Sequence, residues 1–476
     1  MDQSTQGSFQ KIFMIGGFVF GVLGIFVFSI SQFNSSAGDP NLTGTVTVWG
    51  TLPASKISEQ LFDYSQDAKT YSVRYVEIPS DKFTNRFIEA IANEQGPDLL
   101  LVPENISVPL REYLAKFPEG LITEKQFKEK YIRSTYKLYQ PNGVFAFPVA
   151  IDPLVMFVNT DILTNAGFSK APTTWADVPL YVSRVLGFTK SDENSVQRAV
   201  ALGALNNILY NREILLTMLM QLRNDVITWT INGELKRDPI TQEETIEYEE
   251  KFESVLGLSS EDLKVKNDVL AEQVFVFFTS FVNPNIKEAY TWSKRAPLDR
   301  DLFSSGNLGL YFGLASDRDY LNSKNPHLKY EIALMPGPKG ATANFRNTNY
   351  AKIYSVSISG RTRNLVLAQK VMEDILAKEF SNKIVSDYGL APARQDELYT
   401  FIENAQTKEV EAVVEQKRVD QDIIYKAAER GDIVMEPLPN LIKNIFEQIV
   451  EAFSGSRQTP SEIIRNADQE LIRIIQ

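Results

Sequence analysis

The sequence offers few side chains for the common kinds of enzyme chemistry. It has no cysteine and one histidine, His327, which lies in the polar stretch Asn322–Lys329. Disulfides, thiolate metal sites and cysteine nucleophiles are therefore excluded, and a Ser-His-Asp triad would have to form around a residue of a predicted turn. Zinc chemistry and histidine general-base catalysis are disfavoured for the same reason. Only catalysis by carboxylates stays open, so we expect no enzyme, no metal site and no cofactor.

Aromatic and hydrogen-bonding side chains stand at the ends of two predicted strands. Trp49 and Thr51 close the first strand, and Glu104 and Asn105 follow the apolar run 98–102. Ligands of open α/β sheets bind beyond the carboxyl ends of the strands, so these residues are candidates for a binding site. The structural alternatives are a core position for Trp49 and helix N-capping for Glu104 and Asn105.

The elements that must position these residues alternate between strand and helix patterns. An alternating strand at 45–49 is followed by helical spacing over 54–68 and a strand-like segment at 71–78. An amphipathic helix at 83–94 then leads to the apolar run 98–102. Such alternation predicts an α/β protein with a mainly parallel, doubly wound sheet.

Further strand and helix signals follow along the chain. We predict a strand at 143–148 and a long helix between 201 and 223. A hairpin over 226–239 is predicted to turn at Asn232-Gly233, because Asn-Gly favours a type I′ turn. The charge-rich segment 241–266 is interpreted as a solvated helix surface.

An uncharged apolar run of 19 residues, Ile12–Ile30, stands near the N-terminus. Its length is close to the roughly 20 residues that cross a bilayer and exceeds the roughly 7–15 of a signal-peptide core. Lys11 precedes the run and no Lys or Arg follows until Lys56, which favours an inside N-terminus and an outside bulk. We therefore predict a single-pass anchor in the cell membrane, with the bulk of the chain extracytoplasmic. Secretion after cleavage near Ser35-Ser36-Ala37 is the alternative.

The overall charge argues against a nucleic-acid partner. The net charge is −11, the isoelectric point is near 5.0, and no long run of Lys or Arg occurs. A nucleic-acid-binding protein would carry a basic patch to contact phosphates. With 43% hydrophobic and 23% charged residues, the composition is that of a folded protein.

The order of short motifs from about Thr45 to Ile472 resembles one protein family. The family is the extracellular solute-binding proteins of carbohydrate-type ABC importers, which are similar to the maltodextrin-binding protein. The motifs that carry the resemblance are Thr45–Gly50, Gly96–Asp98, Ala146–Pro148, Asn159–Leu163, Pro172–Trp175, Phe303–Gly306, Leu310–Gly313, Leu334–Gly337, Gly389–Arg394, Met435–Pro437 and Ser454–Pro460.

This resemblance implies a two-lobed periplasmic-binding-protein-like fold with three hinge crossings, preceded here by the transmembrane helix. The crossings are expected near 150–153, 311–316 and 356–360. The solute would close between the lobes, the partners would be ABC permease subunits, and the protein would be a monomer. The expected parts of the chain are a cytoplasmic N-terminus at 1–11, the anchor at 12–30, a flexible tether at 31–43, one lobe from 44–151 with 315–357, and a second lobe from 152–314 with 358–476.

The resemblance also implies a sugar or oligosaccharide as the solute. Ring stacking is expected from Trp49, Trp292, Tyr311 and Tyr350, and hydrogen bonds from Thr51, Glu104, Asn105, Asp152, Asn206, Asp317, Arg346 and Asn347. Val102, Asn105 and Val158 depart from the residues that sugar-binding members commonly carry there, which argues against maltodextrin itself. Two alternatives stay open: a membrane-tethered sensor or adhesion module with the same fold, and a glycosidase with paired carboxylates.

Overall fold

The structure is a computed structural model, and it describes most of the chain from Thr43 onward. The described residues are 43–57, 61, 71–118, 120–189, 197–237, 244–257, 271–339, 345–397 and 412–476. The predicted membrane helix and nearly all of the predicted tether lie outside these residues, so both stay predictions. Within the described ranges, no helix combines the length and the apolar character needed to span a bilayer.

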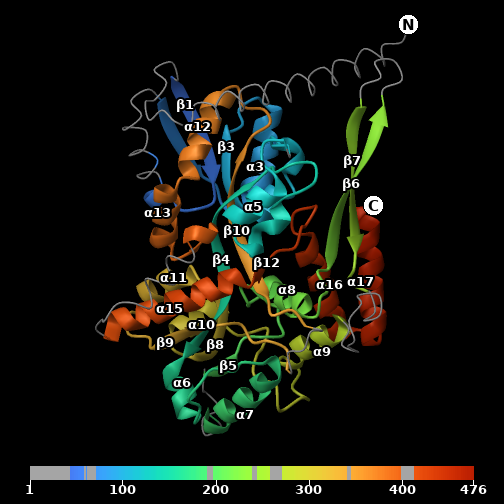
Figure 1. The fold of residues 1–476 in the computed structure, drawn as a ribbon. Helices are drawn as coiled ribbons and strands as arrows, with labels where there is room; N and C mark the ends of the chain where they lie inside the picture. Colours follow the sequence, from blue (N-terminus) through green and yellow to red (C-terminus); the bar gives the residue numbers. More distant parts are fainter. Residues whose placement is uncertain are drawn as a thin grey trace.

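The described strands form one mixed sheet and one separate hairpin (Figure 1). The sheet order is β2-β1-β3-β10-β4-β8-β5, with β9 and β11 also paired to β4 and β12 paired to β10. The strand bounds are β1 Gly44–Gly50, β2 Tyr71–Glu77, β3 Leu99–Pro103, β4 Phe147–Asn159, β5 Arg198–Val200, β6 Ile227–Arg237, β7 Glu244–Ser254, β8 Leu308–Leu314, β9 Tyr330–Ala333, β10 Asn349–Ile358, β11 Ala391–Pro392 and β12 Gly431–Asp432.

Helices cover the sheet and form a group of their own beside it (Figure 1). The α-helices are α3 Ser80–Ala92, α4 Glu104–Ser107, α5 Glu124–Lys130, α6 Thr160–Asn165, α7 Val178–Thr189, α8 Asn211–Gln221, α9 Ala271–Ser280, α10 Asp299–Ser304, α11 Asp317–Lys324, α12 Leu365–Ile375, α13 Lys378–Tyr388, α15 Ala412–Glu429, α16 Leu441–Gly455 and α17 Pro460–Ile475. Short 3₁₀ helices are η1 Arg111–Tyr113, η2 Arg133–Leu138 and η3 Trp175–Asp177.

The direction of the central strands corrects the predicted topology. β1 pairs in parallel with β2 and β3, and β5 pairs in parallel with β8. β10, however, runs antiparallel to β3 and β4, and β4 runs antiparallel to β8. The prediction of a mainly parallel sheet is therefore wrong at its middle. The alternation of apolar residues marks a strand but carries no information about its direction, which the chain path sets.

Strand β4 joins two halves of this sheet. All 13 of its residues are buried, and it is continuous where the sequence suggested a break between 143–148 and the following segment. Its residues up to Pro153 pair with β10, and from Leu154 onward they pair with β8. We call β2, β1, β3, β10 and the start of β4 the first half, and the rest of β4 with β8, β9 and β5 the second half. The predicted hinge crossings and lobe boundaries stay predictions.

The helices beside the sheet follow from simple sequence patterns. In α16, Leu441, Ile442, Ile445, Phe446 and Ile449 are buried, a spacing that places them on one face of the helix. That face packs on α9, where the rings of Phe275 and Phe446 lie 5.4 Å apart. Helices α8, α9, α16 and α17 thereby form one packed group, and α12 lies against β1 and β10.

The predicted hairpin over 226–239 is wrong, because this segment forms a single strand, β6, which pairs with β7 in a longer hairpin. Asn232 and Gly233 lie inside β6, paired with Glu249 and Tyr248 of β7. The pairing continues to Arg237 and Glu244, so the connection falls at 238–243, outside the described residues. The helix interpretation of 241–266 is wrong for Glu244–Ser254, because cross-strand pairing with β6 outweighs its charge-rich composition.

Candidate functional site

The clearest interruption of the buried sheet lies on β10. Eight of its ten residues are buried, and only Lys352 and Tyr354 are half-buried. Alternate residues of a strand face the same side, so the two side chains lie next to each other on one face. Lys352 stands directly opposite Asp152 of β4, and Tyr354 opposite Ala150. Two partly accessible polar side chains therefore lie where β4 passes from the first half to the second.

Lys352 carries a positive charge among carboxylates. Burial acts to lower the pKa of its ammonium, but Tyr354, Asp152 and Glu213 together outweigh burial, and the pKa is raised. The group is therefore charged at neutral pH. Within the described part of the chain, this ammonium makes no direct hydrogen bond or ion pair. Lys352 is thus a donor that can bind a ligand oxygen.

Tyr354 adds a hydroxyl group beside this ammonium. Burial raises the pKa of the phenol to about 12, although Lys352 acts in the opposite direction. The phenol is therefore protonated at neutral pH and can both donate and accept. Tyr75 and Tyr388 interact electrostatically with Tyr354, and their own hydroxyls donate to the carbonyls of Leu52 and Pro53 at 2.8 Å each. Tyr75 and Tyr388 thus lie near Tyr354 and are held to the segment that follows β1.

Asp152, one of the predicted ligand residues, lies beside this polar pair. Its carboxylate accepts hydrogen bonds from the backbone N–H of Ser316 at 3.0 Å and from the Ser316 hydroxyl at 2.6 Å. Burial raises the pKa of Asp152 to about 6, while Lys352 and the Ser316 hydrogen bonds act to lower it. The predicted placement of Asp152 near a site is consistent with this geometry.

Two further predicted residues leave oxygen atoms unused near the ends of neighbouring strands. Thr51 follows β1, Asn105 lies in α4 directly after β3, and these two strands are adjacent in the sheet. The Thr51 Oγ1 and Asn105 Oδ1 atoms are buried and have no hydrogen-bond partner among the described residues. Buried polar atoms are normally paired, so such atoms call for a water or a ligand group.

Glu104 and Tyr350 were predicted as ligand residues, but the structure pairs them with each other. The Tyr350 hydroxyl donates to Glu104 Oε1 at 2.5 Å, and the Ile353 N–H donates to Oε2 at 2.8 Å. The Arg212 guanidinium lies 5.7 Å from the Tyr350 ring centre and donates to Glu436 at 2.6 Å. Burial raises the pKa of Glu104. These buried groups connect β3, β10, α8 and the start of α16.

Asp317 and Tyr311 form a similar closed group. Asp317 accepts hydrogen bonds from Tyr311 at 2.6 Å and Tyr210 at 3.3 Å, and it pairs with Arg300 at 3.1 Å. The Tyr311 ring is fully buried against Phe157. Both residues therefore stabilise the second half of the sheet.

The predicted stacking aromatics are all part of the core. Trp292 is fully buried and its Nε1 donates to Asn207 at 3.0 Å. Trp49, 7% exposed, packs edge-on against Phe83. Together with Tyr311 and Tyr350, they are buried and present no free ring face to a sugar in this conformation. The Arg86 guanidinium lies 5.4 Å from the Trp49 ring centre, as Arg212 lies near that of Tyr350.

The last three predicted residues lie elsewhere on the second half and its surroundings. Asn206 is exposed and donates to the Lys294 carbonyl at 3.2 Å. Arg346 pairs with Asp225 at 2.7 Å, and Asn347 is exposed. The structure does not join these residues to Lys352. Sequence reasoning did not single out Lys352 and Tyr354, although Lys352 is the only charged residue of β10 and lysine is rarely buried.

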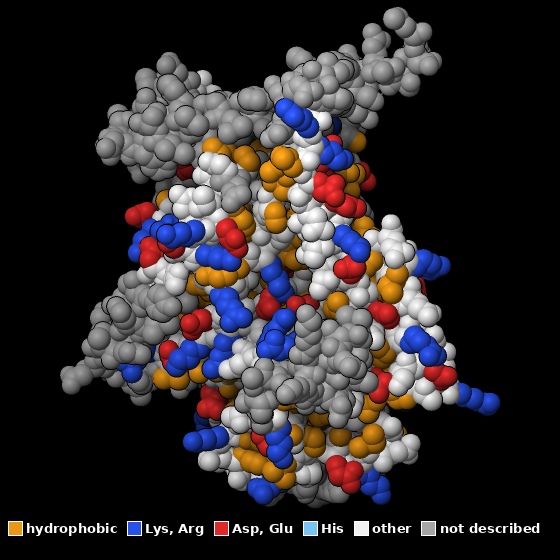
Figure 2. Space-filling view, turned by 45° about the vertical axis from the view of Figure 1, so that its right-hand side comes forward, with side chains coloured by type: hydrophobic (Ala, Val, Ile, Leu, Met, Phe, Trp, Pro, Cys, Tyr) orange, Lys and Arg blue, Asp and Glu red, His pale blue; other side chains and the backbone are white. Residues whose placement is uncertain are grey.

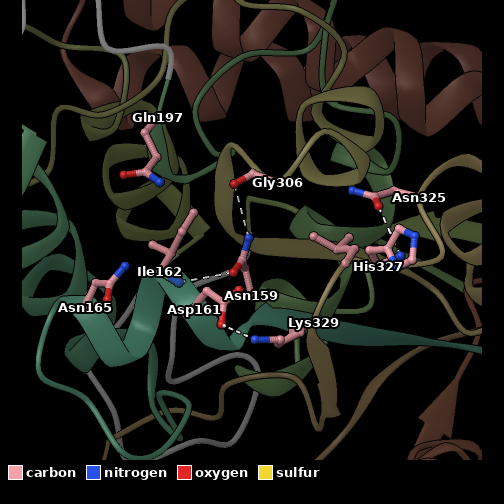
Figure 3. Close-up of a pocket in the computed structure, with 10 residues that line it drawn as sticks. Asn159, Asp161, Ile162, Asn165, Gln197, Gly306, Asn325, His327 and Lys329 are labelled. Carbon is pink, nitrogen blue, oxygen red and sulfur yellow. Dashed lines mark hydrogen bonds and ion pairs between the residues drawn. The ribbon is translucent and has the colours of Figure 1, made fainter.

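A separate pocket of about 240 Å³ lies at the far end of β4 (Figure 3). It is seven residues from Asp152 along the strand, about 23 Å away. Its polar groups are mostly engaged: Asn159 accepts from the Ile162 N–H at 3.1 Å and donates to the Gly306 carbonyl at 3.3 Å. Lys329 lies 3.6 Å from Asp161. We therefore interpret this pocket as structural. His327 lies at its rim and is exposed, in agreement with the predicted turn.

Metal binding receives no support from the described residues. Among them, no cluster of His, Asp or Glu side chains is arranged to hold a metal ion.

Comparisons with known proteins assign the fold. No family model and no curated relative matches the sequence. Solved structures do: a protein from Synechococcus sp. MITs9220, assigned as an oligosaccharide periplasmic-binding protein, superposes with a TM-score of 0.66 at 14% identity, over 90% of this chain and 98% of its own.

Two further solved structures superpose over similar shares of the chain. The GacH receptor of Streptomyces glaucescens GLA.O, solved unliganded and with acarbose, gives a TM-score of 0.62 at 16% identity, over 92% of this chain and 100% of its own. A solute-binding protein of an ABC transporter from Thermotoga lettingae TMO, bound to α-D-tagatose, gives a TM-score of 0.62 at 16% identity. The superposition covers 91% of this chain and 100% of that protein. The chain therefore has the fold of sugar-type periplasmic binding proteins, as the motif order implied.

Proposed function

We propose that this chain is an extracytoplasmic solute-binding protein that holds a sugar or oligosaccharide between two lobes and delivers it to an ABC importer. The fold supports a binding protein, because its structural neighbours are binding proteins for sugars. We keep the lobes as 44–151 with 315–357, and 152–314 with 358–476, with one amendment. Helix α12 packs on β1 and β10, and α13 packs on α12 and donates from the Tyr388 hydroxyl to the Pro53 carbonyl, so we assign both helices to the first lobe.

The observation that carries the proposal is the half-buried pair Lys352 and Tyr354 on an otherwise buried strand. The ammonium donates, the phenol donates and accepts, and Asp152 beside them accepts. Sugar hydroxyls need both kinds of partner at short range, and a few convergent polar groups in an apolar frame are typical of small-ligand sites. The buried, unpaired oxygens of Thr51 and Asn105 extend this set toward the ends of β1 and β3.

The sequence supports the placement of this receptor at a membrane. The apolar run Ile12–Ile30 serves as the anchor, and the segment 31–43 as the tether. The binding body would then stay close to permease subunits in the same membrane. Protease protection in intact cells tests this part: we expect the body, but not residues 1–11, to be cut from outside.

A thermal-shift screen of the full chain in detergent against sugars, polyols, amino acids and peptides tests the binding function. A solute present at 100 times its Kd adds about 2.7 kcal/mol to the free energy of unfolding, so the correct one raises Tm clearly. Product analysis of the same samples should show no turnover; hydrolysis of an oligosaccharide would instead favour a glycosidase. Absence of any shift would contradict the receptor function.

Lys352→Met tests the proposed site itself. Losing a charge-assisted hydrogen bond to the solute should weaken binding by roughly 10- to 100-fold in Kd. Lys329→Met is the matched control, because Lys329 is 73% exposed and lies at the far pocket. Titration calorimetry with the solute from the screen gives both values. Equal affinities for the two variants would place the site elsewhere.

A further inference from the structure

The hairpin of β6 and β7 starts from the second half of the molecule. Directly before it, Gln221 at the end of α8 accepts from Trp175 Nε1 at 2.8 Å and donates to the Pro336 carbonyl, after β9, at 3.0 Å. At the base of the hairpin, the Ser254 hydroxyl donates to Asp468 of α17 at 2.5 Å. Gln221 also donates to the Thr348 carbonyl, just before β10, at 3.0 Å. The root is therefore fixed to the segment after β9, to the start of β10 and to the α16–α17 helix pair.

The middle of the hairpin binds the first half. Glu250 of β7 accepts hydrogen bonds from Arg111 at 2.9 Å, Asn142 at 3.0 Å and Lys116 at 3.3 Å. All three donors lie in the segment between β3 and β4, which is hydrogen bonded to the end of β10 through Ala115 and Ile358 at 2.9 Å. One carboxylate of the hairpin thus accepts hydrogen bonds from three donors of the first half.

Aromatic rings make this contact compact. Trp229 of β6 and Phe252 of β7 are cross-strand partners, and their rings stack 5.3 Å apart at 11°. The Arg111 guanidinium lies 5.3 Å from the Trp229 ring and 4.9 Å from the Phe252 ring, and Phe145 approaches Trp229 at 6.3 Å. Cation–π contacts strengthen when water is excluded, and the side chain of Arg111 is only 13% exposed.

Electrostatics agree with a strong contact at Glu250. Burial acts to raise the pKa of this carboxyl, but Arg111 and Lys116 outweigh it, and the pKa is lowered. The ion pairs are therefore formed at neutral pH. Elsewhere on this side of the molecule Lys, Arg, Asp and Glu are intermingled rather than collected in a single-sign patch (Figure 2). The contact at Glu250 is thus a local, specific one.

We propose that the β6–β7 hairpin is a strap that holds the two halves together and has to release for the proposed binding cleft to open. The inference rests on the proposed two-lobed function. Any rigid-body motion that separates Arg111 from the root of the hairpin at Asp468 breaks the Glu250 contacts or bends the ribbon. Breaking the contact loses three hydrogen bonds to one carboxylate, so the contact favours the arrangement in which the two halves are held together.

Distance measurements between two spin labels test the strap. The sequence contains no cysteine, so Lys125→Cys in the first half and Lys329→Cys in the second give one defined label pair. Both side chains are well exposed, at 84% and 73%. In the full chain in detergent without solute, Glu250→Ala should raise the ratio of long to short distances about tenfold or more.

Glu253→Ala is the matched control. Glu253 lies on the same strand but on the outer face, paired with Lys251 and 50% exposed, so the distances should not change. Glu250→Gln, which keeps the side-chain shape and loses the charge, should give a smaller shift in the same direction even if the alanine variant folds poorly. Distances unchanged in both Glu250 variants, or changed equally by Glu253→Ala, would overturn the strap. Because no solute is added, the outcome is independent of whether a sugar binds.

Discussion

At the scale of single residues, several side chains that were predicted to bind a ligand form hydrogen bonds with other residues of the protein instead. The Glu104 carboxylate and the Tyr350 hydroxyl, each buried, satisfy each other at 2.5 Å. Burying a carboxylate away from water costs free energy unless its oxygens accept hydrogen bonds. The Tyr350 hydroxyl and the Ile353 N–H donate these hydrogen bonds to Glu104. Sequence could identify these residues as polar and adjacent to strand ends, but only the fold decides whether a solute or a neighbour takes the hydrogen bonds.

Tyr350→Phe therefore should destabilise the protein. It leaves Glu104 with one of its two partners in a buried place, which costs about 1–3 kcal/mol. Urea denaturation followed by circular dichroism measures the change. Tyr248→Phe is the control, because Tyr248 is 41% exposed on the hairpin and should change stability by less than about 0.5 kcal/mol. Equal stability of the two variants would show that the Glu104 contact contributes little.

At the scale of elements, helix α17 connects the C-terminus to the root of the hairpin. Its first turn carries a full capping box: Thr459 Oγ1 accepts from the Glu462 N–H at 3.3 Å, and Glu462 accepts from the Thr459 N–H at 2.8 Å. Pro460 occupies a first-turn position where no N–H is needed. These signals are local, so the start of α17 can be derived from sequence, whereas the contact of Asp468 with Ser254 cannot.

Loss of the cap should weaken this helix. Thr459→Ala removes the acceptor for the Glu462 N–H and should lower the free energy of unfolding by about 1 kcal/mol. Thr459→Ser keeps the hydroxyl and should stay within a few tenths of a kcal/mol of the wild type. Hydrogen exchange of the α17 amides provides a second measurement, and it should accelerate only in the alanine variant. Identical exchange in both variants would contradict the role of the cap.

At the scale of the whole molecule, buried acids make stability depend on pH. Burial raises the pKa of Asp152 to about 6, of Asp299 to about 7 and of Glu397 to about 7. Their unfolded values are near 4, so between about pH 4 and 7 the folded state holds protons that the unfolded state releases. The stability contributed by these groups is complete below pH 4 and is lost as the pH rises through 6 to 7.

We therefore expect the free energy of unfolding to be smaller at pH 8 than at pH 5.5. Urea titrations across this range measure the slope. Asp299→Asn should flatten it, because an amide at this buried place does not titrate, and the hydrogen bonds from the Leu209 and Arg300 N–H groups to Oδ1 can be kept. A slope that is the same in the variant and the wild type would assign the pH dependence to other groups.

Much of the architecture could be predicted from sequence because its signals are local. The apolar periodicity of α16, the capping box of α17 and the alternation in β1 each depend on residues close in the chain. The motif order then indicated the binding-protein fold at only 12–16% identity to its structural neighbours. Asp152 was predicted as a ligand residue, and it lies opposite Lys352 on β10; its role in binding stays a prediction.

The rest was decided by contacts between segments far apart in the chain. Asn232-Gly233 favours a turn locally, yet pairing of β6 with β7 along eleven residues each places it inside a strand. Trp292 and Tyr311 have the rings that sugars use, but the core covers them. Lys352 and Tyr354 became the candidate site only when β4 and β10 were side by side. Sequence sets which groups can bind, and tertiary packing sets which of them remain uncovered, because burial is a property of all segments together.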